Sequence, residues 1–171
     1  MSTRVFTVLF LCTGNSARSI MAEAILNHLA PARFRAYSAG SHPKGSVHPY
    51  ALDTLRHFQY PTHGLRSKSW EEFTGRDAPL IDFVITLCDD AANEPCPLWP
   101  GHPVTFHWGL PDPAAVEGNA EATRLAFVAT LRRLRRRLEP WTQLPDAALD
   151  RLIQRHQWDD LGEITAPPDD C

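Results

Sequence analysis

The stretch of sequence that decides the fold reads VFTVLFLCTGNSARS at residues 5–19. Its first half is an apolar run rich in branched and aromatic side chains, which predicts a buried strand over residues 5–11. Cys12 ends this run and Arg18 follows six positions later, so the loop has the pattern C-x5-R. Such a loop between a strand and a helix turns its backbone N–H groups inward and can hold a tetrahedral oxyanion.

Cys12 and Arg18 supply the chemistry of this loop. The planar guanidinium of Arg18 matches two oxygens of an oxyanion at once. A thiol at a helix N-terminus beside an arginine can have its pKa lowered from about 8.5 to roughly 4 to 7, so we expect Cys12 to be an ionised nucleophile. The residues expected to bind the oxyanion are Thr13, Gly14, Asn15, Ser16, Ala17, Arg18 and Ser19. The alternative, that Cys12 is a small buried hydrophobe, does not explain a loop of glycine, asparagine and serines.

Length and charge narrow the class of protein. A chain of 171 residues has room for one α/β domain. The net charge of −3 gives no general attraction to nucleic acid or anionic membranes, and residues 132–137 form the one dense basic run. We interpret that run as a solvated helix face, with a nucleic-acid or partner role as the alternative. The chain has no apolar run near the roughly 20 residues of a membrane span and no cleavable signal pattern. We therefore expect a cytoplasmic protein whose four cysteines are reduced.

The remaining sequence alternates between strand and helix patterns. Strands are expected over residues 34–38, 81–87 and 104–107, and helices over 18–29, 50–58, 70–73, 120–138 and 145–160. This alternation predicts an α/β fold in which a parallel sheet is covered on both faces, with right-handed crossovers. Ligands bind at the carboxyl ends of the strands in such folds, and both Cys12 and Cys88 follow a predicted strand.

Several motifs occur in one order along the chain. They are CTGNSARS at 12–19 with MAEA at 21–24, SAG at 38–40, VITLC at 84–88, HWG at 107–109 and DPA at 112–114. In these residues the chain resembles the arsenate reductases of the low-molecular-weight protein tyrosine phosphatase fold, over about residues 5–138. The resemblance implies a single domain with a four-stranded parallel sheet flanked by helices on both faces. We expect this domain over residues 1–140 and a C-terminal helical extension over 141–171.

The resemblance also implies a reaction, the reduction of arsenate to arsenite. Cys12 would attack arsenate, Asp112 would protonate the departing oxygen, and Cys88 would attack the adduct to form a Cys12–Cys88 disulfide. Cys96 could then attack Cys88, and thioredoxin would reduce the resulting disulfide. No bound cofactor is implied, only an external thiol reductant.

Two enzymatic alternatives stay open. Cys88 and Cys96 are eight positions apart, about one residue more than is usual in relay enzymes, and position 17 holds Ala where relay members often carry Cys. A glutathione and glutaredoxin route would need fewer protein cysteines. The same loop could also hydrolyse phosphate monoesters through a cysteinyl-phosphate, with Asp112 as general acid. Phosphotyrosine enzymes of this fold usually carry Tyr where this chain has Ala114, which favours arsenate.

Two further interpretations of these residues are an anion-binding protein without enzymatic activity and a metal site. An anion sensor would need an unreactive Cys12, and Cys12→Ser would then keep binding. A zinc set could consist of Cys88, Cys96, His102 and His107, but the first two are too far apart for a close-paired zinc knuckle. The family's structural cation would use Asn15, Glu23 and Ser38, but residues 67–70 lack the expected acidic partner. We therefore expect no metal, and Cys171 is expected to be a bystander.

Overall fold

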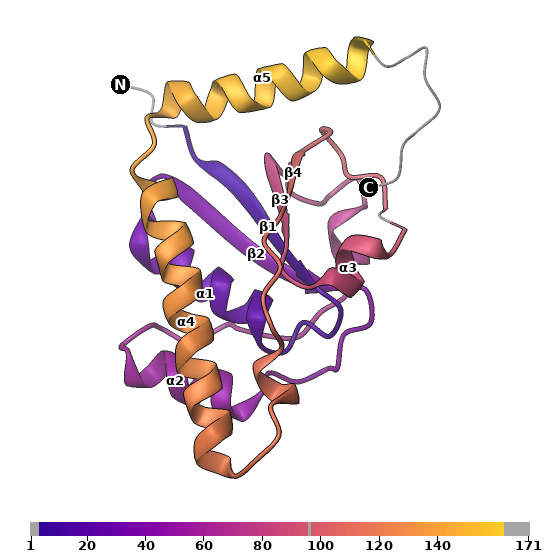
Figure 1. Cartoon of the computed structure of the whole chain (residues 1–171). Helices are drawn as coiled ribbons and strands as arrows, with labels where there is room; N and C mark the ends of the chain where they lie inside the picture. Colours follow the sequence, from indigo (N-terminus) through magenta and orange to yellow (C-terminus); the bar gives the residue numbers. More distant parts are fainter. Residues whose placement is uncertain (1–3, 96, 163–171) are drawn as a thin grey trace.

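The protein is described by a computed structural model over residues 4–95 and 97–162, with side chains described as far as residue 156. Its centre is a four-stranded parallel sheet with strand order β2-β1-β3-β4 (Figure 1). The strands are β1 (Phe6–Cys12), β2 (Phe34–Gly40), β3 (Phe83–Thr86) and β4 (Val104–His107). The predicted four-stranded parallel α/β fold is confirmed.

Helices flank the sheet on both faces. The helical elements are α1 (Arg18–Leu29), α2 (Pro49–His57), η1 (Trp70–Phe73), α3 (Asp89–Asn93), η2 (Pro113–Ala115), α4 (Ala120–Thr142) and α5 (Asp146–Gly162). Helix α1 packs on β1 and β2, and α4 packs on α1 and α2, so these three helices cover one face. The short η1 contacts β2 on the opposite face, where Trp70 and Phe73 pack with Trp99.

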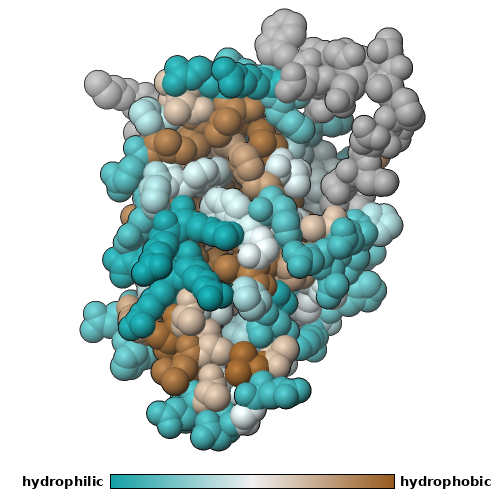
Figure 2. All heavy atoms as spheres, viewed as in Figure 1, coloured by the Kyte–Doolittle hydropathy of each residue, from teal (hydrophilic) through white to brown (hydrophobic). Residues whose placement is uncertain are grey.

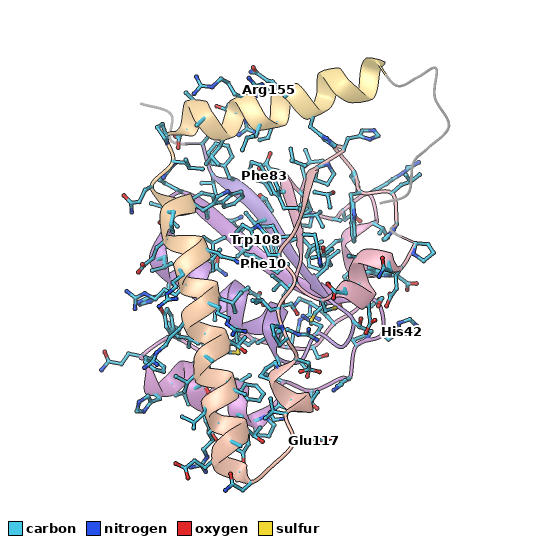
Figure 3. The ribbon with its side chains drawn as sticks, in the orientation of Figure 1. Phe10, His42, Phe83, Trp108, Glu117 and Arg155 are labelled. Carbon is cyan, nitrogen blue, oxygen red and sulfur yellow. The ribbon has the colours of Figure 1, made fainter. Side chains whose placement is uncertain are left out.

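The alternation of side chains along β1 explains both layers. Phe6, Val8 and Phe10 belong to the larger core under α1 and α4, whereas Leu9 and Leu11 belong to the smaller core under η1. Figure 3 shows Phe10 and Phe83 in the interior of the molecule, among the side chains between the strands and the helices. Because β1 is buried on both faces, its sequence is a continuous apolar run, as is typical of a central parallel strand.

Some elements differ from the prediction. Strand β3 is shorter than residues 81–87, and β2 extends two residues beyond Ser38. Helix α4 continues through Pro140 to Thr142 rather than ending at residue 138, because a proline in the last turn removes a single helical hydrogen bond. The elements α3 and η2 were not predicted. In α3 only Ala91 is buried, so this five-residue helix has no apolar period to recognise.

Helix α5 lies across the amino ends of the strands, opposite the end where Cys12 lies (Figure 1). Arg33, which directly precedes β2, donates from Nη1 to the Thr142 carbonyl and from Nη2 to the Leu144 carbonyl, both at 2.6 Å. Leu149 of α5 is fully buried in the larger core. The division of the chain at residue 140 stays a prediction, and the Pro-rich tail after residue 164 lies outside the described residues.

The basic run lies on the outer face of α4. Leu131, Leu134 and Leu138 are buried, whereas the five arginines of residues 132–137 are exposed. Figure 2 shows a broad hydrophilic band over α4 on the viewed face. The leucines of α4 therefore face the core and its arginines face the solvent. In the described part of the chain, no helix is long and apolar enough to cross a membrane.

Candidate active site

The carboxyl ends of β1, β3 and β4 bring together residues that are far apart in the sequence. A pocket of about 190 Å³ opens there. Its lining consists of Cys12, Thr13, Gly14, Asn15, Ser16, Ala17, Arg18, His42, Lys44, Asp90, Asp112 and Ala114. Every predicted oxyanion-binding residue except Ser19 is in this lining.

The floor of the pocket is the loop between β1 and α1. Within the part of the chain that the structure describes, none of the backbone N–H groups from Gly14 to Ala17 donates a hydrogen bond to another protein group. Polar N–H groups without a protein acceptor at the start of a helix are suited to an oxyanion, which is stabilised there by the helix dipole as well.

Asn15 holds the loop in shape from below. Its side chain is fully buried and its φ is +42°, in the left-handed region expected for this residue. Its Nδ2 donates to Ser19 Oγ at 2.9 Å, and its Oδ1 accepts from the Lys68 backbone N–H at 2.8 Å. Ser19 therefore lies beneath the loop, and its backbone N–H points to Cys12 instead of into the pocket.

A second segment, residues 41–48, runs along the loop, and we call it the rim segment. The backbone N–H groups of His42, Lys44 and His48 donate to the carbonyls of Thr13, Gly14 and Ser16. The distances are 3.0, 2.9 and 2.8 Å. The rim segment places the side chains of His42 and Lys44 in the pocket lining, and Figure 3 shows His42 beside α3. Neither residue was predicted from the sequence to lie in the pocket.

The close approach of the two segments depends on Gly40, the last residue of β2. A Cβ atom at this position would lie 2.4 Å from the Thr13 carbonyl oxygen and 3.0 Å from Asn15. Side chains cannot be accommodated at such distances without moving the backbone. The SAG motif therefore has a steric role at the edge of the pocket.

Arg18 and Asp112 face each other across the pocket. Arg18 Nη1 donates to the Leu110 carbonyl at 2.8 Å, and its Nη2 lies 3.8 Å from Asp112 Oδ2. The other Asp112 oxygen accepts from the Ala114 backbone N–H at 2.9 Å. Asp112 is thus oriented by η2, and its carboxyl group can reach a group that Arg18 binds.

Cys12 and Cys88 form a buried pair of thiols, each only 4% exposed, at the side of the pocket. They are close enough to share a hydrogen bond. This bond, with burial, raises the pKa of Cys12 well above its usual value, although Arg18 and the Ser19 N–H act in the opposite direction. The prediction of a lowered Cys12 pKa is therefore wrong, because the hydrogen bond with Cys88 and burial outweigh the effect of Arg18.

The pKa of Cys88 is shifted in the opposite direction. The hydrogen bond with Cys12 lowers the pKa of Cys88 to about 5, and Thr13 and the Ala91 N–H act in the same direction as Cys12. Cys88 is the N-cap residue of α3, where backbone N–H groups favour a thiolate. The hydrogen bond with Cys12 is the largest of these contributions, and burial acts in the opposite direction.

The remaining predicted residues are not brought into one metal site. Cys96 lies outside the described residues. His107 bonds to Thr86 and Asp89, and no group of three or more His, Cys, Asp or Glu in the described residues could hold a metal ion. The buried Glu23 accepts from the Ser38 hydroxyl at 2.7 Å and lies 3.9 Å from the Lys68 ammonium. Burial raises the pKa of Glu23 and lowers that of Lys68.

The family profile of the low molecular weight phosphotyrosine protein phosphatases matches residues 7–155, and the chain belongs to this family. Within it, the chain is similar to arsenate reductases. It is 38% identical over 120 residues to the arsenate reductase of Shouchella clausii (strain KSM-K16), covering 70% of this chain and 83% of that protein. The predicted resemblance is confirmed.

Two solved structures agree with this similarity. One is an arsenate reductase in the phosphate binding state, with a TM-score of 0.62 and 28% identity over 80% of this chain and 98% of that one. The other is a thioredoxin-dependent arsenate reductase of Corynebacterium glutamicum, with a TM-score of 0.55 and 25% identity. That match covers 81% of this chain and 64% of the other, so this chain spans less than two thirds of that protein.

Proposed function

We propose that the protein reduces arsenate to arsenite, with Cys12 as nucleophile and Cys88 as the second thiol. The observation that carries this proposal is the contact between two buried thiols, of which Cys12 lines the pocket. Hydrolysis of a phosphate ester needs one thiol, whereas two-electron reduction of a bound oxyanion needs two. The similarity to arsenate reductases supports the same assignment.

The first step forms a sulfur–arsenic bond. The free N–H groups of the loop and the Arg18 guanidinium bind the arsenate oxygens. The Cys12 proton passes along the hydrogen bond to the Cys88 thiolate, and Cys12 attacks arsenic. The arsenate hydroxyl leaves as water after taking a proton from Asp112, the general acid. Arsenic stays in its +5 state.

The second step transfers the electrons. Cys88 attacks the Cys12 sulfur, so that a sulfur–sulfur bond forms and the sulfur–arsenic bond breaks. The electron pair of that broken bond stays on arsenic, which becomes arsenic(III), and the two thiols are oxidised to a disulfide. The Cys88 proton goes to an arsenite oxygen, and solvent supplies the protons that complete arsenous acid. The contact between the two sulfurs means that this step needs little rearrangement.

The disulfide must then be reduced by an external thiol. We favour a relay in which Cys96 attacks Cys88 and thioredoxin reduces the Cys88–Cys96 disulfide, in line with the similarity to a thioredoxin-dependent enzyme. The glutathione and glutaredoxin route would leave Cys96 unused. Either donor fits a cytoplasmic protein, because thiols are kept reduced there. We also propose a domain boundary near residue 140, with the active site in the part before it and α5 in the part after it.

The test is arsenite release from arsenate by the purified protein, with thioredoxin or with glutathione and glutaredoxin. Wild type is compared with Cys12→Ser, Cys88→Ser and Cys96→Ser, and Cys171→Ser is the matched control that should keep full activity. Loss in the first two variants supports the proposed pair, and loss in Cys96→Ser with thioredoxin supports the relay. Retained turnover in Cys88→Ser would refute the second step. Hydrolysis of an aryl phosphate with no arsenite from either donor would make the protein a phosphatase.

A further inference from the structure

His107, at the end of β4, connects three elements beside the thiol pair. Its Nε2 lies 2.9 Å from Asp89 Oδ1 on α3, and its Nδ1 lies 2.8 Å from Thr86 Oγ1 on β3. Because a carboxylate only accepts, the Nε2–H of His107 donates to Asp89. The Thr86 hydroxyl can donate to Nδ1 or accept from it, so that both the neutral and the protonated ring fit.

Gly109 is part of the same arrangement. A Cβ atom there would lie 3.0 Å from both Asp89 Oδ1 and His107 Nε2. The backbone at Gly109 therefore covers the hydrogen bond closely, and a side chain would press on both partners. The arrangement is fixed on one side by Thr86 and on the other by this glycine.

Asp89 is the first residue of α3 and directly follows Cys88. The first hydrogen bond of this short helix runs from the Ala92 N–H to the Cys88 carbonyl at 3.2 Å. Holding Asp89 therefore holds the helical turn that begins at Cys88. The other end of α3 is held separately, because Glu94 Oε1 lies 3.4 Å from Thr13 Oγ1 and Glu94 Oε2 lies 3.9 Å from His42 Nδ1.

The contact between His107 and Asp89 also affects the charge near the Cys88 thiol. The charged groups nearest to the thiol pair are Asp89 and Asp90 of α3, Glu94 at its C-cap, and Arg18, which acts on Cys12. Asp89 is the acidic group adjacent to Cys88 in the chain, and its charge opposes a thiolate. The N–H of His107, or its full charge when protonated, offsets that carboxylate.

We propose that His107 is a positioning residue for Cys88: by holding Asp89 it keeps the first turn of α3, and so the Cys88 sulfur, in place against Cys12. This positioning role adds detail to the proposed function. Its expected effect on the rate of arsenite release rests on that function. His107 is not in the pocket lining, so oxyanion binding should not depend on it.

The experiment uses the full chain carrying Cys96→Ser and Cys171→Ser, so that Cys12 and Cys88 are the only thiols. His107→Ala removes the donor, His107→Gln places an amide N–H near the position of Nε2, and the exposed His63→Ala is the matched control. Thiolate absorbance against pH is measured without any oxyanion, and arsenite release in a single turnover is measured with arsenate. Phosphate affinity is measured for every variant.

We expect His107→Ala to lower both the acid dissociation constant of the Cys88 thiol and the single-turnover rate by about threefold. This is the size of effect expected for the loss of a partly exposed ion pair. His107→Gln should restore most of both values, and phosphate affinity should be unchanged throughout. Equal titration curves for wild type and His107→Ala would overturn the proposal, as would an equal loss in His107→Gln or a parallel loss of phosphate affinity. If wild type titrates as expected but makes no arsenite, the proposed function fails and the positioning role is still decided by the titration.

Discussion

Replacing Asn15 with alanine separates the shape of the oxyanion loop from the stability of the fold. The Lys68 backbone N–H would be left buried without its acceptor, which costs about 1–3 kcal/mol, and losing the bond to Ser19 costs about 1 kcal/mol more. An alanine at a φ of +42° adds about 1 kcal/mol. We therefore expect the free energy of unfolding to fall by about 3–5 kcal/mol.

The assay combines denaturant unfolding with phosphate titration calorimetry. The matched control is Asn27→Ala, because Asn27 also makes two hydrogen bonds, to the backbone N–H and carbonyl of Ala36 at 2.8 and 3.0 Å, but joins α1 to β2 away from the pocket. Both variants should lose stability, and only Asn15→Ala should lose phosphate affinity, by about tenfold or more. Asn15→Gly should be about 1 kcal/mol more stable than Asn15→Ala, because glycine adopts the left-handed backbone angle without strain.

One result would refute this reasoning. If Asn15→Ala unfolds with a loss of 3–5 kcal/mol but binds phosphate as tightly as wild type, the loop does not need its buried support to keep its N–H groups convergent. The oxyanion would then be held by Arg18 and the helix terminus alone. An unfolding loss below about 1 kcal/mol would instead show that Lys68 and Ser19 find other partners.

Three further changes have distinct expected results. Gly40→Ala should destabilise the protein by about 1–3 kcal/mol in denaturant unfolding, whereas Gly75→Ala, with no atom within 4 Å of its Cβ, should be neutral or slightly stabilising. Iodoacetamide labelling of Cys88, followed by tandem mass spectrometry, should stay constant from pH 8 to about pH 6 and fall as the pH drops through about 5, because the reactive thiolate is then protonated. A fall already complete by about pH 8 would contradict the lowered pKa. Arg33→Ala should lower the free energy of unfolding by about 2 kcal/mol without changing phosphate affinity, and the exposed neighbour Arg35→Ala should change neither.

The central strand and its loop were predictable because their signals are local. The apolar run of β1 reflects burial on both faces, and Asn15 marks a loop position with a left-handed backbone angle. The predicted roles of Cys12 and Arg18 follow from the same few residues. Nothing beyond residues 5–19 is needed to expect an oxyanion at the start of α1.

The features that were missed depend on long-range contacts. Lys68 supports the loop through its backbone N–H, which leaves no trace in its residue type. The reversed pKa values arise because Cys88, 76 positions from Cys12 in the chain, lies against it with α3 behind it. His42 and Lys44 enter the pocket only because the rim segment pairs with the loop through main-chain atoms. Spacing along the sequence carries none of this information.

The pairing of the rim segment with the loop has a consequence for redesign. Its three hydrogen bonds are made by backbone N–H and carbonyl groups, so the wall of the pocket is held in place whatever side chains it displays. Position 44 is exposed and, unlike position 42, makes no ion pair with Glu94 in the described residues, which makes it a natural site for a saturation library. Such a library would vary the size and charge presented to an incoming anion while the catalytic scaffold stays constant. Discrimination between tetrahedral anions of different size could thus be altered independently of the redox chemistry.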